Sequence, residues 1–211
     1  MVVALIYVII VLIAFWLGWR FLSRRKLVPC PAWLGWVVDR DNPFARAARS
    51  ENIVRLLGLA AGARVADIGC GPGRVTIPLA KAVGPGGQVI AMDVQEAVLE
   101  KVAAKTKAQG LANIRLVRSD ARDRALQEGS FDGVVLVMAL GEIPQQEKAI
   151  SRIHALLKNN GRLLIAESVF DPHFMNKDTV RDLGMHAGFV ETKYEGDVLS
   201  YAIVFEKPSC A

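Results

Sequence analysis

The sequence is poor in cysteine and histidine, and it has no acidic residue before Asp39. Its three cysteines, Cys30, Cys70 and Cys210, are odd in number and scattered, without a C-x-x-C pair. That pattern disfavours a disulfide framework and a zinc site, and it is typical of a reducing compartment. The H-E-x-x-H, G-x-S-x-G and P-loop lysine patterns are also missing, so we expect no metal site and no chemistry that depends on those motifs.

The excess of positive charge is local. Lys and Arg number 26 against 21 for Asp and Glu, and four of the basic residues, Arg20, Arg24, Arg25 and Lys26, lie within the first 26 positions. The rest of the chain therefore carries 22 basic and 21 acidic residues, a net charge of only about +1. A nucleic-acid-binding protein needs a broad cationic face, so we expect no nucleic-acid partner. With 22% charged and 52% hydrophobic residues, the chain is expected to fold.

A run of 18 residues from Val2 to Trp19 contains no charge, polar amide or proline. As a helix it would rise roughly 27 Å, close to the hydrocarbon thickness of a bilayer, and few buried core helices are apolar on every face. A cleaved signal peptide would need a basic segment first, whereas here Met1 leads straight into the apolar run. We therefore predict a single-pass membrane anchor over residues 1–26, with the basic flank and the rest of the chain on the cytoplasmic side.

Residues 27–44 begin with the apolar stretch LVPCPAWLGWVV, whose two prolines interrupt it too much for a second span. We interpret this segment as an interfacial linker, which either lies along the membrane surface or packs onto the domain that follows. Residues 45–211 are predicted to form that domain, which has an ordinary size.

Within the domain, short runs rich in Val and Ile alternate with longer amphipathic stretches, which predicts an α/β fold with a mostly parallel sheet. The expected strands are Arg64–Asp67, Gln88–Asp93, Ile114–Arg118, Phe131–Val137, Gly161–Ala166, Glu191–Glu195 and Ser200–Lys207. The expected helices are Arg46–Leu57, Arg74–Val83, Gln95–Gln109, Pro144–Leu157 and Lys177–Ala187. The turn signals GPGG (Gly84–Gly87) and NNG (Asn159–Gly161) are expected where a helix is followed by a strand.

The stretch RVADIGCGPG predicts a strand that runs into Gly69, Gly71 and Gly73 and then into a helix. Glycine lets the backbone turn sharply and approach a ligand without a Cβ atom in the way, and the helix start presents free N–H groups nearby. The spacing is G-x-G-x-G, whereas the dinucleotide fingerprint is G-x-G-x-x-G. Asp67, two residues before the first glycine, would repel a pyrophosphate and favour a cation. The loop therefore predicts a cofactor with a positive centre and no phosphate.

Two further carboxylates follow the next strands. Asp93 ends the stretch QVIAMD, twenty residues after Gly73, where a carboxylate can accept both hydroxyls of a ribose. Asp120 follows the third strand and is placed to accept from the exocyclic amine of an adenine. Each acid alone would more often be a helix cap or a solvated turn residue. Together with Asp67, however, they occupy the carboxyl ends of three successive strands, the edge at which α/β sheets bind ligands.

Residues 45–207 resemble a class I S-adenosylmethionine-dependent methyltransferase through the stretches VADIGCGPGRVTIPLA, VIAMDVQ, RSDARD, FDGVVLVMALGEIP and LLKNNGRLLIAES, in this order. Within that family the chain is most similar to enzymes related to the ubiquinone/menaquinone C-methyltransferases. The resemblance implies a Rossmann-like, seven-stranded, mostly parallel sheet with a reversed last strand and helices on both faces, and S-adenosyl-L-methionine as the cofactor. It also implies contacts to the methionine moiety from Asp67, Gly69, Gly71 and Gly73, to the ribose from Asp93 and Val94, and to the adenine from Asp120 and Ala121, with Met138 closing the site.

Methyl transfer from a sulfonium is an in-line displacement, so positioning and water exclusion supply much of the catalysis. A base is needed only when the nucleophile carries a proton. The candidates are Glu142, Glu167 and His173, which follow or end the fourth and fifth strands. Related enzymes often have a histidine where this chain has Gly141 and Glu142. The alternative is a solvated loop or a helix N-terminal charge for the two glutamates, and we expect His173 to be an exposed turn residue.

The leading functional hypothesis is a membrane-anchored methyltransferase that acts on a lipophilic small molecule, such as a quinone precursor or a lipid. Tethering would concentrate the active site in the layer where such an acceptor dissolves. A rival hypothesis makes the acceptor a side chain, such as lysine, of a membrane protein. A nicotinamide oxidoreductase is disfavoured by the glycine spacing and Asp67, and a non-catalytic module by the intact motif set. The expected partners are thus the lipid bilayer and one of these acceptors, and the oligomeric state is left open.

Overall fold

The structure, a computed structural model, describes residues 38–209 and, before them, residues 6–8, 10, 11, 14, 18, 20 and 21. The described positions from 6 to 21 are helical. Within the described part of the chain, no helix is long and apolar enough to cross a membrane. Much of the predicted span, residues 2–19, and residues 27–37 of the predicted linker lie outside the described residues, so the anchor and the boundaries 1–26, 27–44 and 45–211 stay predictions.

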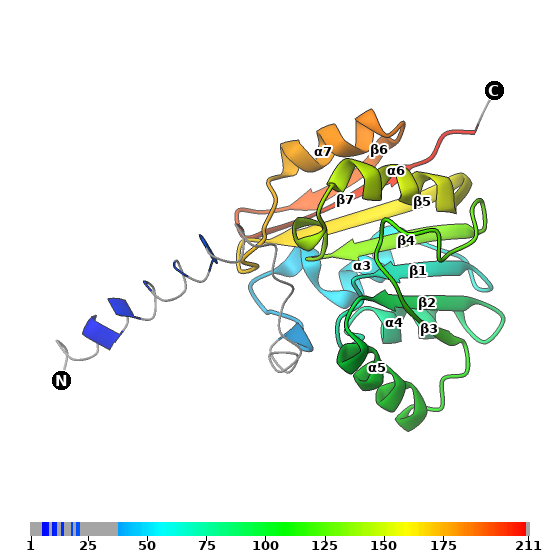
Figure 1. The fold of residues 1–211 in the computed structure, drawn as a ribbon, viewed down its shortest axis with the longest axis horizontal. Coiled ribbons are helices and arrows are strands. Elements are labelled where there is room, and N and C mark those ends of the chain that lie inside the picture. The colour runs from blue at the N-terminus through cyan, green and yellow to red at the C-terminus, as the bar shows by residue number, and fades with distance from the viewer. Residues whose placement is uncertain are drawn as a thin grey trace.

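The domain is built on a seven-stranded sheet with the strand order β3-β2-β1-β4-β5-β7-β6 (Figure 1). The strands are β1 (Arg64–Ile68), β2 (Gln88–Asp93), β3 (Ile114–Arg118), β4 (Phe131–Val137), β5 (Leu157–Ser168), β6 (Val190–Gly196) and β7 (Ser200–Glu206). β1 pairs in parallel with β2 and β4, β2 with β3, and β4 with β5, whereas β7 runs antiparallel to β5 and β6. The predicted mostly parallel sheet of seven strands with a reversed last strand is confirmed.

Helices cover both faces of the sheet, as predicted (Figure 1). They are η2 (Arg46–Ala48), α3 (Ser50–Leu57), α4 (Thr76–Val83), α5 (Glu96–Ala108), η3 (Leu140–Glu142), α6 (Gln146–Leu156) and α7 (Lys177–His186). α3 and α4 pack on the face that includes Val65 and Val135, and α6 and α7 on the face that includes Ala66 and Val134. Neighbouring residues of one strand thus face opposite layers, and both are apolar because helices bury both sides of the parallel strands.

Two local predictions differ from the structure. The helix expected over Arg46–Leu57 is interrupted at Arg49, whose extended backbone (φ −69°, ψ 144°) separates η2 from α3. The NNG signal at Asn159–Gly161 lies within β5 and not before it, where the pairing of β5 with β4 shifts register. Asn160 has a φ of 62° there, a left-handed conformation that asparagine tolerates better than most residues. The signal therefore marks an irregularity inside a strand and not a helix-to-strand turn.

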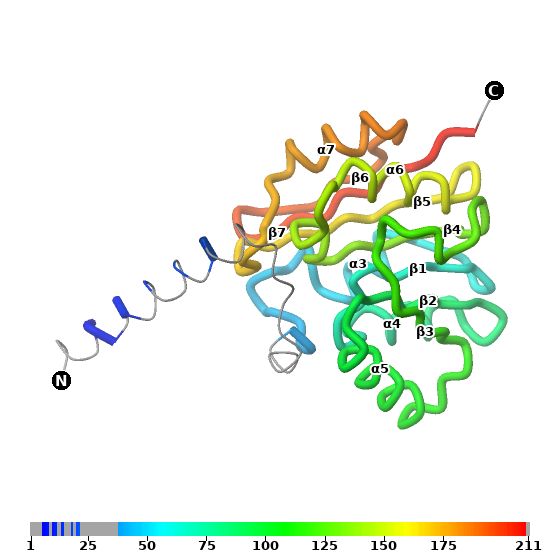
Figure 2. Tube along the Cα trace, viewed as in Figure 1, coloured from blue at the N-terminus to red at the C-terminus, as the bar shows by residue number. Residues whose placement is uncertain are grey.

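The order of the strands creates a switch point between β1 and β4, because β2 and β3 lie beyond β1 and β5 lies beyond β4. Open α/β sheets bind ligands outside the carboxyl ends of their strands at such a point. The loops that follow β1, β2, β3, β4 and β5 all leave the sheet at this same edge, since these five strands are parallel (Figure 2). We call it the carboxyl edge, and every predicted site residue lies along it.

Candidate functional site

The glycine loop that follows β1 is held against β2 by hydrogen bonds. Gly69 and Cys70 donate their N–H groups to the carbonyl of Met92 over 2.8 and 3.1 Å. The N–H of Gly71 donates to Oδ2 of Asp93 over 3.1 Å. The three glycines of this loop have φ values of 70°, 52° and 87°, which would cost a residue with a side chain about 1–2 kcal/mol each. The sharp turn predicted from the glycine spacing is therefore present.

The surroundings of the three glycines differ. A Cβ atom at Gly69 would lie 2.6 Å from Cβ of Ala139, and one at Gly73 would lie 3.2 Å from Cγ2 of Val102. At Gly71 a Cβ atom would meet nothing within 4 Å among the described residues beyond its two chain neighbours. Close packing therefore excludes a side chain at Gly69 and leaves little room for one at Gly73, whereas Gly71 borders space that is open to a ligand.

Asp67 lies near the end of β1 and is almost fully buried, with 2% of its surface exposed. Its Oδ2 accepts a 2.6 Å hydrogen bond from Oγ1 of Thr76. That bond and the charge of Arg74 favour the carboxylate, but burial outweighs both and raises the pKa of Asp67 to about 6. Most of this carboxylate is ionised at neutral pH, and a buried negative charge favours a cation bound beside it.

Asp93, at the end of β2, contacts both the glycine loop and the residue that precedes α5. Its Oδ1 accepts from the N–H of Gln95 over 2.9 Å, and its Oδ2 accepts from Gly71. Burial raises the pKa of Asp93, and the charge of Glu142 adds to that rise. The charge of Glu142, in the loop after β4, therefore acts on Asp93 at the end of β2. Val94, the second residue expected at the ribose, is 44% exposed.

Asp120, after β3, binds the neighbouring Arg122. Nε and Nη2 of Arg122 donate to Oδ1 and Oδ2 of Asp120, each over 2.8 Å, and this contact lowers the pKa of Asp120. A carboxylate has about four acceptor sites, so capacity remains for an exocyclic amine. Ala121 is buried beside it. The adenine contacts of Asp120 and Ala121 stay predictions.

The chain turns abruptly after β4. Met138 has a φ of 53°, which is rare for a residue with a side chain and is often found at functional sites. Its N–H donates to the carbonyl of Ala166 in β5 over 2.8 Å. The short helix η3, which the sequence did not indicate, follows and carries Glu142. This turn keeps the loop after β4 at the carboxyl edge.

The three predicted catalytic residues form one cluster beside that turn. Nδ1 of His173 lies 3.5 Å from Oε1 of Glu142 and 3.7 Å from Oδ1 of Asp171. Glu167 belongs to the same cluster electrostatically, since burial and then the charges of Asp171 and Glu142 raise its pKa well above the ordinary value. The protonated form of Glu167 is therefore favoured, which makes this residue a hydrogen-bond donor more readily than a base.

The expectation that His173 is an exposed turn residue is wrong, because only 6% of its surface is exposed. The physical reason is close packing of the two loops: a Cβ atom at Gly141 would lie 2.0 Å from the carbonyl oxygen of His173. The solvated alternative for Glu167 is also excluded. Glu167 is 1% exposed, lies in β5 opposite Tyr201 of β7, and has an Oε1 with no hydrogen-bond partner among the described residues.

Asp171 was not predicted from the sequence. Its Oδ1 accepts the backbone N–H of His173 over 2.6 Å, and burial raises its pKa to about 6. The signal available was the stretch DPH, in which an aspartate two residues before an N–H commonly forms a local turn. That signal indicates a turn but not burial beside a second carboxylate.

The end of the predicted linker contacts the domain next to the glycine loop. Asp39 pairs with Lys105 of α5, whose Nζ also donates to the carbonyl of Pro72 over 2.7 Å. Asp41 pairs with Arg74, the residue that follows the last glycine. This part of the linker therefore packs onto the domain. No local pattern indicated these pairs, because their partners are distant in the sequence.

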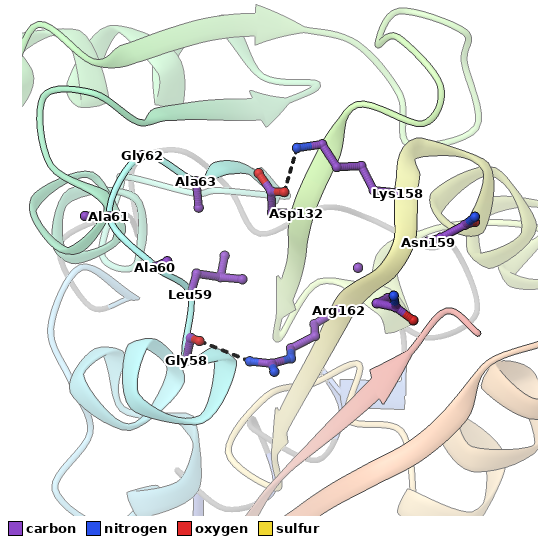
Figure 3. A pocket seen from close by; sticks show the side chains of 12 residues that line it. Gly58, Leu59, Ala60, Ala61, Gly62, Ala63, Asp132, Lys158, Asn159 and Arg162 are labelled. Atoms are coloured by element: carbon purple, nitrogen blue, oxygen red, sulfur yellow. Dashed lines mark hydrogen bonds and ion pairs between the residues drawn. The ribbon is translucent and has the colours of Figure 1, made fainter. Parts of the chain in front are cut away.

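A separate cavity of about 450 Å³ lies at the opposite end of the strands (Figure 3). Its lining comes from residues 58–63, Asp132 and residues 158–162. Its charged groups are engaged within the chain, since Lys158 donates to Asp132 over 2.6 Å and Arg162 donates to the carbonyl of Gly58 over 3.0 Å. None of the predicted site residues lines this cavity, so it is distinct from the candidate site.

Comparison with known proteins finds similar methyltransferases. Residues 65–161 match the family described as "Methyltransferase domain". The chain is similar to the demethylmenaquinone methyltransferase of Geobacillus kaustophilus, with 31% identity over 118 residues that cover 56% of this chain and 50% of the relative. The chain therefore spans about half the length of this curated relative.

Solved structures show the same fold. A SAM-dependent methyltransferase from Aquifex aeolicus superposes with a TM-score of 0.75 at 21% identity, over 84% of this chain and 99% of that one. The 1,6-didemethyltoxoflavin-N1-methyltransferase of Burkholderia thailandensis was solved with bound 1,6-didemethyltoxoflavin and S-adenosylhomocysteine. It has a TM-score of 0.64 at 22% identity, and the match covers 80% of each chain. At these identities the likeness establishes the fold alone.

The carboxyl edge fits S-adenosylmethionine. Asp67 offers a buried negative charge for a cationic ligand, Gly71 borders open space, and Asp93 has acceptor capacity for ribose hydroxyls. The expected enzyme class agrees with the family match and with the curated relative, and the geometry of the edge fits the expected cofactor. Residues 65–161 of this chain thus match a methyltransferase domain in sequence, and the domain has the fold of a solved SAM-dependent methyltransferase.

Proposed function

We propose that the chain is a membrane-anchored S-adenosylmethionine-dependent methyltransferase whose acceptor is a lipophilic small molecule of the quinone-precursor or lipid class. The observation that carries this proposal is the similarity of its domain to a demethylmenaquinone methyltransferase. A demethylmenaquinone is a lipid-soluble aromatic molecule, so an enzyme that methylates it must meet it at a membrane. The 18-residue uncharged run at the start of this chain would hold the domain there.

The exposure of apolar side chains supports the anchor. Ile6, Tyr7, Val8 and Ile10 have between 51% and 69% of their surface exposed. Apolar surface in water costs about 25 cal/mol per Å², a cost that insertion into a bilayer removes. The basic residues that follow the run would keep the domain on the cytoplasmic side of a single-pass membrane protein, with the bilayer as a partner.

The acid–base groups suit a hydroxylated aromatic acceptor. S-adenosylmethionine, when bound, supplies the methyl group as a sulfonium. Nδ1 of His173 lies 3.5 Å from a carboxylate oxygen of Glu142 and 3.7 Å from one of Asp171, so two negative charges would attract an imidazolium there. The imidazole is therefore suited to accept the hydroxyl proton of a quinol acceptor. Glu167 would act as a hydrogen-bond donor.

The test incubates the full-length protein with methyl-labelled S-adenosylmethionine and membranes from its own source. The products are then separated into an organic extract and a protein gel. Label in the organic extract is the expected result, and mass spectrometry then identifies the acceptor. Label in a protein band would contradict the small-molecule proposal and favour a side chain, such as lysine, of a membrane protein. Gly71→Val, which fills the open space beside the glycine loop, is the control and should give no label in either fraction.

A further inference from the structure

Arg20 connects the N-terminal helical residues to the loop after β5, across 149 residues of sequence. Its Nη1 donates to the carbonyl of Val169 over 2.9 Å and to the carbonyl of Asp171 over 3.1 Å. The guanidinium is partly buried where it makes these contacts. Of the four basic residues after the apolar run, Arg20 is the one that the structure describes.

The loop that Arg20 contacts carries residues of the cluster that is proposed to act on the acceptor. It joins β5 to α7 and carries Asp171 and His173, and Nδ1 of His173 lies near the carboxylates of both Asp171 and Glu142. The side chain of Asp171 accepts the N–H of His173, so the backbone at Asp171 and the imidazole of His173 form one small turn. A displacement of this turn would therefore move His173 relative to Glu142.

The two ends of the loop have attachments to the rest of the sheet. Near β5, the N–H of Val169 donates to the carbonyl of Leu199 over 2.9 Å. Near α7, the hydroxyl of Tyr201 donates to the carbonyl of Met175 over 2.8 Å. Arg20 contacts the first half of the turn between them and binds two carbonyls two residues apart. Charge-assisted hydrogen bonds of this kind are about twice as strong as neutral ones.

We propose that Arg20 is a positioning residue of the acceptor site, so that the end of the N-terminal apolar segment fixes the loop after β5 in addition to any role in membrane attachment. This inference rests on the proposed function and deepens it. It implies that the position of the loop after β5 depends on the position of the N-terminal segment. The charge of Arg20 also acts on Asp171, whose pKa it lowers against the effect of burial.

The experiment compares Arg20→Ala with Arg25→Ala in the full-length protein in detergent micelles. Both variants remove one positive charge from the same basic flank, and Arg20 is the one for which the structure gives contacts with the loop. The acceptor is reduced demethylmenaquinone, and the readouts are its KM, kcat, the Kd of S-adenosylmethionine, and hydrogen exchange of residues 169–175. A third variant, Arg20→Lys, keeps the charge and one flexible donor group.

Arg20→Ala should raise the KM of the quinol about ten-fold and speed exchange in the loop, with the Kd of S-adenosylmethionine unchanged. Arg25→Ala should match the wild type in all four readouts, and Arg20→Lys should recover part of the loss. Equal behaviour of the two alanine variants would overturn the proposal, since Arg20 would then act only as a basic residue of the flank.

The failure of the proposed function is distinguishable from the failure of this inference. If the wild type does not turn over the quinol, that acceptor class is wrong, and loop exchange alone decides the role of Arg20. Faster exchange of residues 169–175 in Arg20→Ala than in Arg25→Ala supports the positioning role. Equal exchange in the two variants rejects it.

Discussion

Nδ1 of His173 lies 3.5 Å from Oε1 of Glu142, although the two residues belong to loops that follow different strands. Gly141 permits this approach, because a Cβ atom at that position would lie 2.0 Å from the carbonyl oxygen of His173. Asp171 adds a second carboxylate at 3.7 Å from the same nitrogen. With two carboxylates beside the same nitrogen, the imidazole is suited to receive a proton, and the packing of two loops creates that arrangement.

Gly141→Ala tests whether this loop contact matters. The added methyl group must push the loops apart, and overpacking of this kind costs about 1–3 kcal/mol. We expect methyl transfer to fall by at least about ten-fold, because His173 moves away from Glu142, while affinity for S-adenosylmethionine stays near the wild-type value. Steady-state kinetics and a cofactor titration check both. Gly86→Ala is the matched control, since a Cβ atom there meets nothing within 4 Å. Wild-type turnover in Gly141→Ala would show that the contact is irrelevant to transfer.

The pH dependence of cofactor binding should report on Asp67. Its pKa in the folded protein is about 6, above the ordinary 3.8, so the folded state holds more protons than the unfolded state between these values. The contribution of this group to stability therefore falls as pH rises through that window. Binding of a cation favours the ionised form instead, so affinity for S-adenosylmethionine should fall as pH drops below 6, by up to about ten-fold per pH unit.

Calorimetric titration of the cofactor across this pH range measures the effect. Asp67→Asn should bind more weakly at neutral pH and should lose the pH dependence below 6, because the amide does not titrate. The same slope in the variant and the wild type would assign the dependence to another group.

Gly69 and Gly71 should separate folding from binding. Both have positive φ, so alanine at either position costs about 1–2 kcal/mol in backbone strain. At Gly69 the new Cβ atom also lies 2.6 Å from Ala139, so Gly69→Ala should lower the melting temperature further. At Gly71 the new atom enters open space, so Gly71→Ala should melt closer to the wild type and bind S-adenosylmethionine at least about ten-fold more weakly. Thermal unfolding and titration of both variants check this, and a reversed order would mean that the ligand lies elsewhere.

The sequence predicted the sheet, its helices and the sharp glycine turn after β1 because these depend on local patterns. Val- and Ile-rich runs mark strands, and glycines two residues apart after a strand mark a loop that only glycine can form. The burial of His173, the role of Asp171 and the contact of Arg20 were not predicted, since each arises where segments distant in sequence pack together. The spacing of residues along the sequence does not reveal contacts between distant segments.

Glu167→Gln tests which role the buried glutamate has. Burial and the charges of Asp171 and Glu142 raise its pKa well above the ordinary 4.5, so the protonated carboxyl, which glutamine mimics in shape, is favoured in the folded protein. A raised pKa means that the folded state holds an extra proton, and stability from this group is lost as pH rises above 4.5. The variant lacks that loss, so its melting temperature relative to the wild type should increase with pH. Methyl transfer should continue, because glutamine still donates a hydrogen bond.

Glu142→Gln, which removes the carboxylate facing His173, should instead lower the rate of transfer. Abolished transfer in a stable, cofactor-binding Glu167→Gln protein would make Glu167 the base and leave Glu142 and His173 with a positioning role.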